Sequence, residues 1–79
     1  MIKVLYFARF REELGCAEEQ LNGIESVDQL LCTLKSRGEP WSRVLDGKVL
    51  CAVNQVMASD DQSLTAGDEV GIFPPVTGG

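Results

Sequence analysis

The sequence contains no histidine, and its three cysteines, Cys16, Cys32 and Cys51, are widely spaced without a C-x-x-C pair. Histidine is the usual general base near neutral pH and a common metal ligand, so its absence argues against acid–base or zinc chemistry. An odd number of cysteines at such spacings argues against a disulfide framework. We therefore expect no metal site, and free, mostly buried thiols that pack in the core of a protein from a reducing compartment.

Basic residues and long hydrophobic runs are also scarce. Seven lysines and arginines stand against twelve acidic residues, for a net charge of −5. The basic residues form no cluster, whereas nucleic acid requires a basic face that neutralises phosphates. The apolar N-terminal stretch includes Lys3 and Arg9, which excludes a signal-peptide core or a membrane span. We expect a cytoplasmic protein that binds neither nucleic acid nor membrane, and whose acidity suits a basic protein surface.

The chain is short, with 79 residues. A domain of this size buries only about 60% of the surface of its unfolded chain and has little room for an enclosed substrate pocket. The sequence also lacks the G-x-x-x-x-G-K-[ST] phosphate loop and any dinucleotide fingerprint, so we expect no cofactor bound by this chain. These features favour a binding or carrier role over a self-contained enzyme.

Hydrophobic spacing predicts strands and helices in an order typical of an α+β fold with helices on one face of a sheet. The clearest element is an amphipathic helix that begins at Ser26, with Gln29 completing a capping box, and ends before Gly38 and Pro40. The other predicted elements are strands at 2–6, 17–21, 49–53, 56–57 and 69–73, a helix at 8–14 and a helical turn at 41–45.

Strand alternation places two aromatic rings away from the predicted main helix. Phe7 lies on the side of Lys3, and Phe73 lies on the side of Gly71, if both segments are extended. Should the first and last strands be neighbours, both rings share one outward face, with Met57 as a third apolar member. Such a patch is typical of a partner-binding surface. The alternative is that the chain's own helices cover the rings.

The last six residues read Pro74-Pro75-Val76-Thr77-Gly78-Gly79. The prolines end the strand and favour an extended backbone, so the pattern predicts a domain at 1–73 and an extended, flexible tail at 74–79 with a reach of about 20 Å. Two glycines make the end thin enough for a narrow channel. By composition roughly one chain in two hundred ends in Gly-Gly, so an ordinary frayed terminus is the alternative.

A carboxylate at such an end is inert until it is activated, typically as an acyl adenylate formed with ATP. Because the sequence lacks a phosphate-binding loop, another protein would have to activate Gly79. The chain would then be a substrate and carrier, with catalytic side chains supplied by its partners.

Four segments together resemble one family. They are the opening Met1-Ile2-Lys3-Val4-Leu5-Tyr6-Phe7-Ala8, the segment Ala52-Val53-Asn54-Gln55, the run Leu64-Thr65-Ala66-Gly67-Asp68-Glu69-Val70 and the ending Phe73-Pro74-Pro75-Val76-Thr77-Gly78-Gly79. They resemble the MoaD family, the small subunits of molybdopterin synthase, over essentially the whole chain. The resemblance implies a ubiquitin-like β-grasp fold, with a mixed sheet of about five strands packed on one main helix.

The resemblance also implies a chemistry for the chain's end. An E1-like adenylyltransferase would use ATP to adenylate Gly79, which is then converted to a thiocarboxylate. The sulfur would pass to cyclic pyranopterin monophosphate in molybdenum cofactor biosynthesis. The tail, including Gly78, would insert into the large subunit of molybdopterin synthase, whose catalytic side chains act on it in a heterotetramer of two small and two large subunits. The partner-binding residues are then Phe7, Met57, Phe73, Pro74, Pro75, Val76 and Thr77.

Two other functions remain open from the residues. One is a sulfur carrier for thiazole synthesis or a ubiquitin-like modifier for protein conjugation. The other is a non-catalytic β-grasp interaction module whose tail is never activated.

Overall fold

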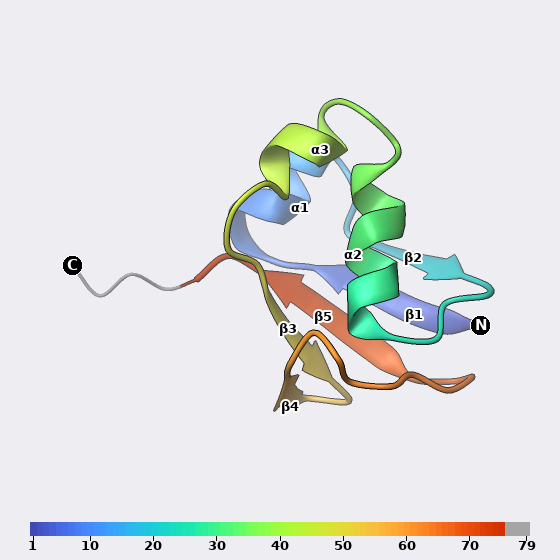
Figure 1. Cartoon of the computed structure of the whole chain (residues 1–79). Coiled ribbons are helices and arrows are strands. Elements are labelled where there is room, and N and C mark those ends of the chain that lie inside the picture. The colour runs from blue at the N-terminus through green and yellow to red at the C-terminus, as the bar shows by residue number, and fades with distance from the viewer. Residues whose placement is uncertain (76–79) are drawn as a thin grey trace.

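The computed structural model describes residues 1–75, and this part of the chain forms a five-stranded sheet with three helices (Figure 1). The strands are β1 (Ile2–Tyr6), β2 (Glu18–Leu21), β3 (Leu50–Val53), β4 (Val56–Ala58) and β5 (Glu69–Phe73), and the helices are α1 (Ala8–Leu14), α2 (Val27–Lys35) and α3 (Trp41–Val44). The strand order is β2-β1-β5-β3-β4. The central pair β1 and β5 is parallel, and the other neighbours are antiparallel.

This arrangement confirms the predicted α+β class and the β-grasp that the resemblance implied. Each predicted strand and helix is present. The bounds predicted at 2–6, 8–14 and 69–73 agree with the structure, and the other elements differ by one or two residues at an end. The strand predicted at 17–21 is an edge strand, β2, and β1 lies inside the sheet. The β3–β4 hairpin turns at Asn54 and Gln55, whose φ angles of 51° and 70° suit a two-residue hairpin turn.

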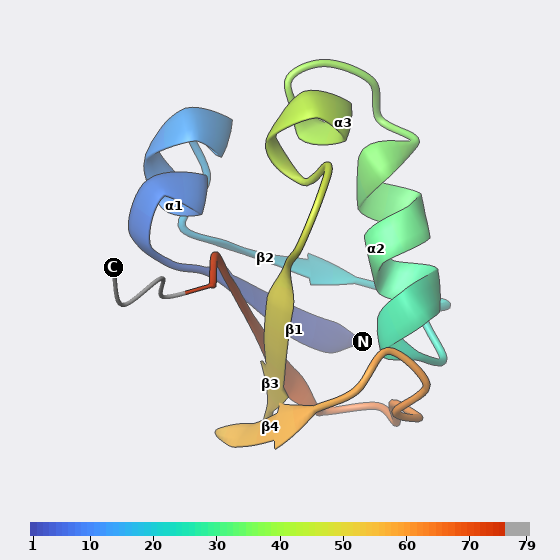
Figure 2. The ribbon, with the colours of Figure 1, turned by 60° about the vertical axis from the view of Figure 1, so that its left-hand side comes forward.

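The core lies between the helices and one face of the sheet, as the rotated view shows (Figure 2). Alternate residues of β1, namely Ile2, Val4 and Tyr6, are at most 2% exposed. They meet the apolar stripe of α2, which contains Leu30 and Leu34. The side chains that the period of two places on one face of β1 therefore pack against those that the period of about 3.6 places on one face of α2.

The main helix begins as its capping pattern predicts. The backbone N–H of Gln29 donates to the Ser26 hydroxyl at 3.1 Å. The Gln29 side chain accepts a hydrogen bond at 2.6 Å from the N–H of Glu25, one residue before the N-cap. The capping box is therefore present, although its return bond reaches one residue further back than the usual pattern.

A polar cluster joins the open edge of the sheet to the chain after α2. Tyr6 donates its hydroxyl to Glu19 Oε2 at 2.6 Å, and Arg37 donates to both oxygens of the same carboxylate at 2.9 and 2.7 Å. The Arg37 guanidinium also lies 4.4 Å from the centre of the Trp41 ring. A bidentate pair with this stacking fixes β2 against the α2–α3 connection.

We expect Glu19→Gln to destabilise the fold at neutral pH and to reduce its acid sensitivity. The hydrogen bonds from Arg37 hold the pKa of Glu19 below its ordinary value. A carboxyl with a depressed folded-state pKa stabilises the fold above its unfolded pKa of about 4.3, and that stability is lost as the pH falls through the lower folded value. Urea unfolding should show a loss of about 1–2 kcal/mol at pH 7.

The difference between Glu19→Gln and the native chain should shrink as the pH is lowered below about 4. Glu12→Gln, which removes the same charge at an exposed position of α1, is the comparison for net-charge effects. A Glu19→Gln penalty that stays constant from neutral to acidic pH would show that Arg37 does not stabilise the ionised carboxyl.

Candidate functional site

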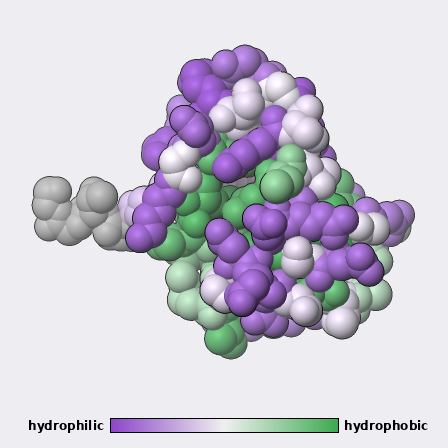
Figure 3. Space-filling view, in the orientation of Figure 1, coloured by the Kyte–Doolittle hydropathy of each residue, from purple (hydrophilic) through white to green (hydrophobic). Residues whose placement is uncertain are grey.

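The sheet face opposite the helices carries the side chains that strand alternation predicted to point outward. We call it the outer face, and it comprises Lys3, Leu5, Phe7, Leu50, Ala52, Met57, Glu69, Gly71 and Phe73. Phe7 is 45% exposed and Met57 is 59% exposed, whereas Phe73 is half-buried. The alternative in which the chain's own helices cover Phe7 is therefore wrong. In the space-filling view, hydrophobic residues reach the surface at the lower edge, where β4 lies (Figure 3).

Strand register brings residues from four strands into one row on the outer face. Leu5 is paired with Gly71, Gly71 with Ala52, and Ala52 with Met57. The condition placed on the aromatic patch, that the first and last strands are neighbours, is met because β1 pairs with β5.

Local backbone geometry keeps Phe7 on the outer face while the chain crosses to the other side. The N–H of Phe7 donates to the carbonyl of Ile72 at 3.1 Å, which extends the β1–β5 pairing by one residue. Ala8 then adopts a φ of 54°, a left-handed value that is rare for a residue with a Cβ. This turn sends α1 to the helical face immediately after Phe7.

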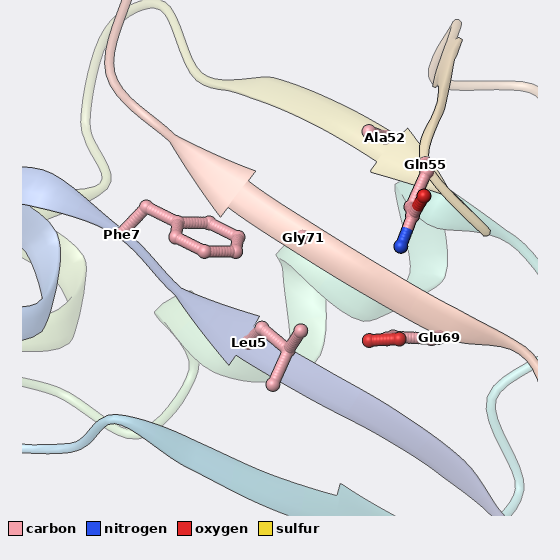
Figure 4. Close-up of a pocket in the computed structure, with 6 residues that line it drawn as sticks. All are labelled: Leu5, Phe7, Ala52, Gln55, Glu69 and Gly71. Atoms are coloured by element: carbon pink, nitrogen blue, oxygen red, sulfur yellow. The ribbon is translucent and has the colours of Figure 1, made fainter.

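The ring of Phe7 points toward Gly71, with its Cε2 edge against the glycine (Figure 4). A Cβ placed on Gly71 would come within 2.8 Å of Phe7 Cε2, closer than two non-bonded carbon atoms normally approach. Glycine inside a strand usually marks a close approach by another group, and here that group is the aromatic ring. The ring of Phe7 can therefore lie at this position because Gly71 has no Cβ.

We expect Gly71→Ala to destabilise the native chain and to stabilise a chain that already carries Phe7→Ala. In the native chain the added methyl overpacks against the ring, at a cost of about 1 kcal/mol or more. Without the ring, alanine should recover the roughly 0.5–1 kcal/mol that glycine costs inside a strand. A double-mutant cycle by chemical denaturation measures this reversal of sign. The same effect of Gly71→Ala in both backgrounds would mean that the Phe7 ring does not clash with a Cβ at position 71.

A shallow hollow lies between the Phe7 ring and the β3–β4 turn. It has a volume of about 180 Å³ and is lined by Leu5, Phe7, Ala52, Gln55, Glu69 and Gly71 (Figure 4). Small-molecule sites usually measure about 300–1,000 Å³. The outer face is therefore better suited to contact with a protein than to enclosing a substrate.

The cysteines are less uniformly buried than the sequence suggested. Cys51 is 2% exposed, and burial raises the pKa of its thiol to about 11. Cys16 is half-buried and Cys32 is exposed, so the expectation of mostly buried thiols is wrong for Cys32. A raised pKa makes a thiol a poor nucleophile, which agrees with a packing role for Cys51.

Residues 1–75 contain no group of acidic or cysteine side chains arranged to hold a metal ion. Asp60 and Asp61 lie in the loop after β4, and Asp68, just before β5, accepts a hydrogen bond from the N–H of Thr65 at 2.9 Å. None of the helices described for this chain is long and apolar enough to cross a membrane.

The predicted tail begins at the outer face. β5 ends at Phe73, one residue past the Ile72 carbonyl that Phe7 contacts, and Pro74 and Pro75 follow as half-buried residues. The remaining predicted tail residues, Val76, Thr77, Gly78 and Gly79, lie outside the described part of the chain. Their roles, and the division into a domain at 1–73 and a tail at 74–79, stay predictions.

Sequence reasoning identified Phe7, Met57 and Phe73 on the outer face but missed the residues that shape the hollow. Gly71 had been assigned to the side of Phe73, and two small residues, Ala52 and Gly71, stand within predicted strands. That pattern could have suggested a depression. The contributions of Gln55 and Glu69 depend on strand register, for which the sequence carries no signal.

Known proteins resemble this chain over its whole length. The ThiS family model matches residues 4–79. The chain is 48% identical over 81 residues to the molybdopterin synthase sulfur carrier subunit of Escherichia coli strain K12, with both chains covered completely. This confirms the resemblance that four segments of the sequence carried.

Two solved structures share the fold. A putative molybdopterin converting factor, subunit 1, from Pyrococcus furiosus is 36% identical, with a TM-score of 0.76 over 95% of this chain and 97% of that chain. The small archaeal modifier protein 1 of Methanosarcina acetivorans is 29% identical, with a TM-score of 0.80 over 99% of this chain and 95% of that chain. By sequence and by fold, the chain therefore belongs to the ThiS family of ubiquitin-like β-grasp proteins.

Proposed function

We propose that this chain is the sulfur carrier subunit of molybdopterin synthase. The observation that carries the proposal is the 48% identity to the Escherichia coli sulfur carrier subunit, which covers all of both chains and so includes the Gly-Gly end. The outer face supports it, because a small domain with exposed apolar side chains at the root of its tail is suited to hold a partner while the tail enters that partner.

The chemistry takes place at the carboxylate of Gly79. An E1-like adenylyltransferase joins this carboxylate to the AMP part of ATP and releases pyrophosphate. A sulfur donor then displaces AMP and leaves a thiocarboxylate, whose sulfur is transferred to cyclic pyranopterin monophosphate. All the bonds that change lie at the end of the chain, in ATP, in the sulfur donor or in the pterin precursor. No side chain of residues 1–75 has to act on them, and the catalytic groups come from the activating enzyme and the large subunit.

The large subunit would dock on the outer face. Phe7, Met57 and Phe73 would contact it, and the tail from Pro74 through Thr77 would lead Gly78 and Gly79 into its active site. Phe73 ends the strand that neighbours Phe7, so one partner surface can cover the apolar patch and receive the tail. Two small and two large subunits would form the complete enzyme.

A second candidate is a ubiquitin-like modifier that is conjugated to other proteins. The TM-score of 0.80 to the small archaeal modifier protein 1 of Methanosarcina acetivorans favours it. The identity to that protein is 29%, well below the 48% to the molybdopterin synthase subunit, so the sulfur carrier function is the better supported of the two.

Complementation in bacteria tests the proposal. This chain, expressed in an Escherichia coli strain that lacks its own molybdopterin synthase carrier subunit, should restore activity of a molybdenum enzyme. A strain that lacks the thiazole-pathway carrier serves as the control and should still require thiamine. Rescue of the second strain alone would assign the chain to thiazole synthesis, and rescue of neither strain would favour the modifier or the interaction module.

We expect the thiols to be dispensable for sulfur transfer. A chain with Cys16→Ser, Cys32→Ser and Cys51→Ala should carry and deliver sulfur at close to the native rate, since the proposed chemistry uses only the terminal carboxylate. Alanine is chosen at position 51 because a serine hydroxyl would be buried there without an assured hydrogen-bond partner. A folded triple variant that no longer delivers sulfur would place a thiol in the transfer path.

A further inference from the structure

The outer-face hollow contains an acidic group that the proposed function does not use. We propose that the hollow between Phe7 and Glu69 receives a lysine or arginine side chain of the large subunit, an inference that rests on the proposed function. The residues that line the hollow are mostly apolar, and the one carboxylate among them, that of Glu69, lies at the end away from Phe7.

The shape of the hollow suits a side chain with an apolar stem and a charged end. Gly71 and Ala52 form a floor of small residues, and Leu5 and the Phe7 ring stand on one side (Figure 4). Glu69 and Gln55 supply the polar groups at the end away from Phe7. Lysine and arginine place their methylene groups along apolar surface and keep the charge at the tip. A volume of about 180 Å³ leaves room for roughly one such side chain.

The charge at the polar end lacks a partner within the described part of the chain. No ion pair of residues 1–75 includes Glu69. Lys3 of β1 is the register partner of Glu69. The Lys3 ammonium, however, lies 3.4 Å from Oε2 of Glu18, a residue of β2 on the opposite edge of β1. The chain as a whole carries a net charge of −5. A cation for Glu69 is therefore best supplied by the protein that covers this face.

Hydrogen bonds of Asn54 fix the backbone at the polar end of the hollow. The N–H of Asn54 donates to the Glu69 carbonyl at 2.7 Å, and the N–H of Glu69 donates to the Asn54 side-chain oxygen at 3.0 Å. Asn54 also donates its side-chain amide to Asp68 at 3.1 Å. These contacts fix the turn that carries Gln55 against the start of β5. A preformed site loses less entropy on binding than one that must be ordered.

A purely apolar side chain in the hollow is disfavoured. Docking of the partner over Phe7 would remove water from the Glu69 carboxylate, and a carboxylate that is desolvated without a partner costs several kcal/mol. A basic side chain fills the same volume and pairs with the carboxylate. The chain should therefore bind a partner that places a basic side chain in the hollow more tightly than a partner that places an apolar side chain there.

Calorimetric titration of the chain with the large subunit from the same organism tests the inference. Glu69→Gln keeps the size of the side chain and removes its charge, and it should weaken binding about tenfold. Glu25→Gln is the matched control, because it changes the net charge equally at an exposed position in the loop before α2. The control should bind within about twofold of the native chain, since exposed charges away from the contact contribute little. Circular dichroism confirms that both variants are folded.

The outcomes separate the inference from the function on which it rests. Tight binding of the native chain with equal binding of Glu69→Gln would overturn the basic side chain but leave the sulfur carrier function standing. Equal weakening by Glu69→Gln and Glu25→Gln would assign the effect to net charge and also overturn the inference. Failure of the native chain to bind the large subunit would overturn the proposed function itself.

Discussion

Removal of Gly79 should abolish sulfur delivery and leave the fold intact. The proposed reaction needs the terminal carboxylate at a fixed point in two active sites, and loss of one residue shortens the reach by about 3.5 Å. A misplacement of about 1 Å can already cost a hundredfold in rate. The deletion lies beyond β5, the last strand of the sheet, so unfolding by urea should be unchanged. Sulfur transfer to the pterin precursor, assayed with purified partners, measures the loss.

Two further changes at the same position sharpen this prediction. One added residue after Gly79 displaces the carboxylate in the opposite direction, and Gly79→Val adds a branched side chain to an end that, in the proposed function, enters a narrow channel. Both should deliver no measurable sulfur. A glycine added before Met1, which is exposed, is the matched control and should transfer sulfur normally. Sulfur delivery by the extended chain would show that the terminal carboxylate is not the reacting group.

Phe7→Ala and Phe73→Ala should each weaken association with the large subunit by more than about 1 kcal/mol, or roughly fivefold. Phe7 is 45% exposed, and its ring packs against Gly71, so it is presented to a partner without a large entropy cost. Phe73 ends β5, the strand next to Phe7, and leads into the tail. Isothermal titration calorimetry on folded variants gives the affinities.

Val56→Ala provides the control for the loss of apolar surface. Val56 is 69% exposed and is paired with Val53, whose side chain points to the helical side of the sheet rather than to the outer face. Its truncation should leave the affinity within about twofold of native. Native affinity in both phenylalanine variants would move the interface to another surface.

Much of the fold was predictable because apolar residues recur in each helix and strand with the spacing typical of that element. The apolar residues of α2 recur at 27, 30, 31 and 34, which fixes both the helix and its buried stripe. The same period would have shown that Cys32 lies off the stripe and is exposed. Pairing of β1 with β5 entered only as a condition, since alternation along one strand contains no information about which strand lies beside it.

The candidate site was predictable in part for the same reason. Alternation places Phe7 and Phe73 on the outer face, where Phe7 is exposed and Phe73 is half-buried, and Met57 was added to them as a third apolar residue. The hollow could not be found in this way, because it depends on the Phe7 ring reaching across to Gly71 and on the β3–β4 turn approaching Glu69. The cluster of Tyr6, Glu19 and Arg37 likewise joins positions that share no periodic spacing.

Intact-protein mass spectrometry tests the carrier function most directly. The native chain is incubated with the activating enzyme, ATP and a sulfur donor, and then analysed whole and after digestion. The predicted result is the mass change of one oxygen replaced by sulfur, located in the C-terminal peptide that contains Gly79 and absent when ATP is withheld. An unchanged mass, or sulfur attached to a cysteine instead of the terminal carboxylate, would contradict the proposal that this chain carries sulfur at its C-terminal glycine.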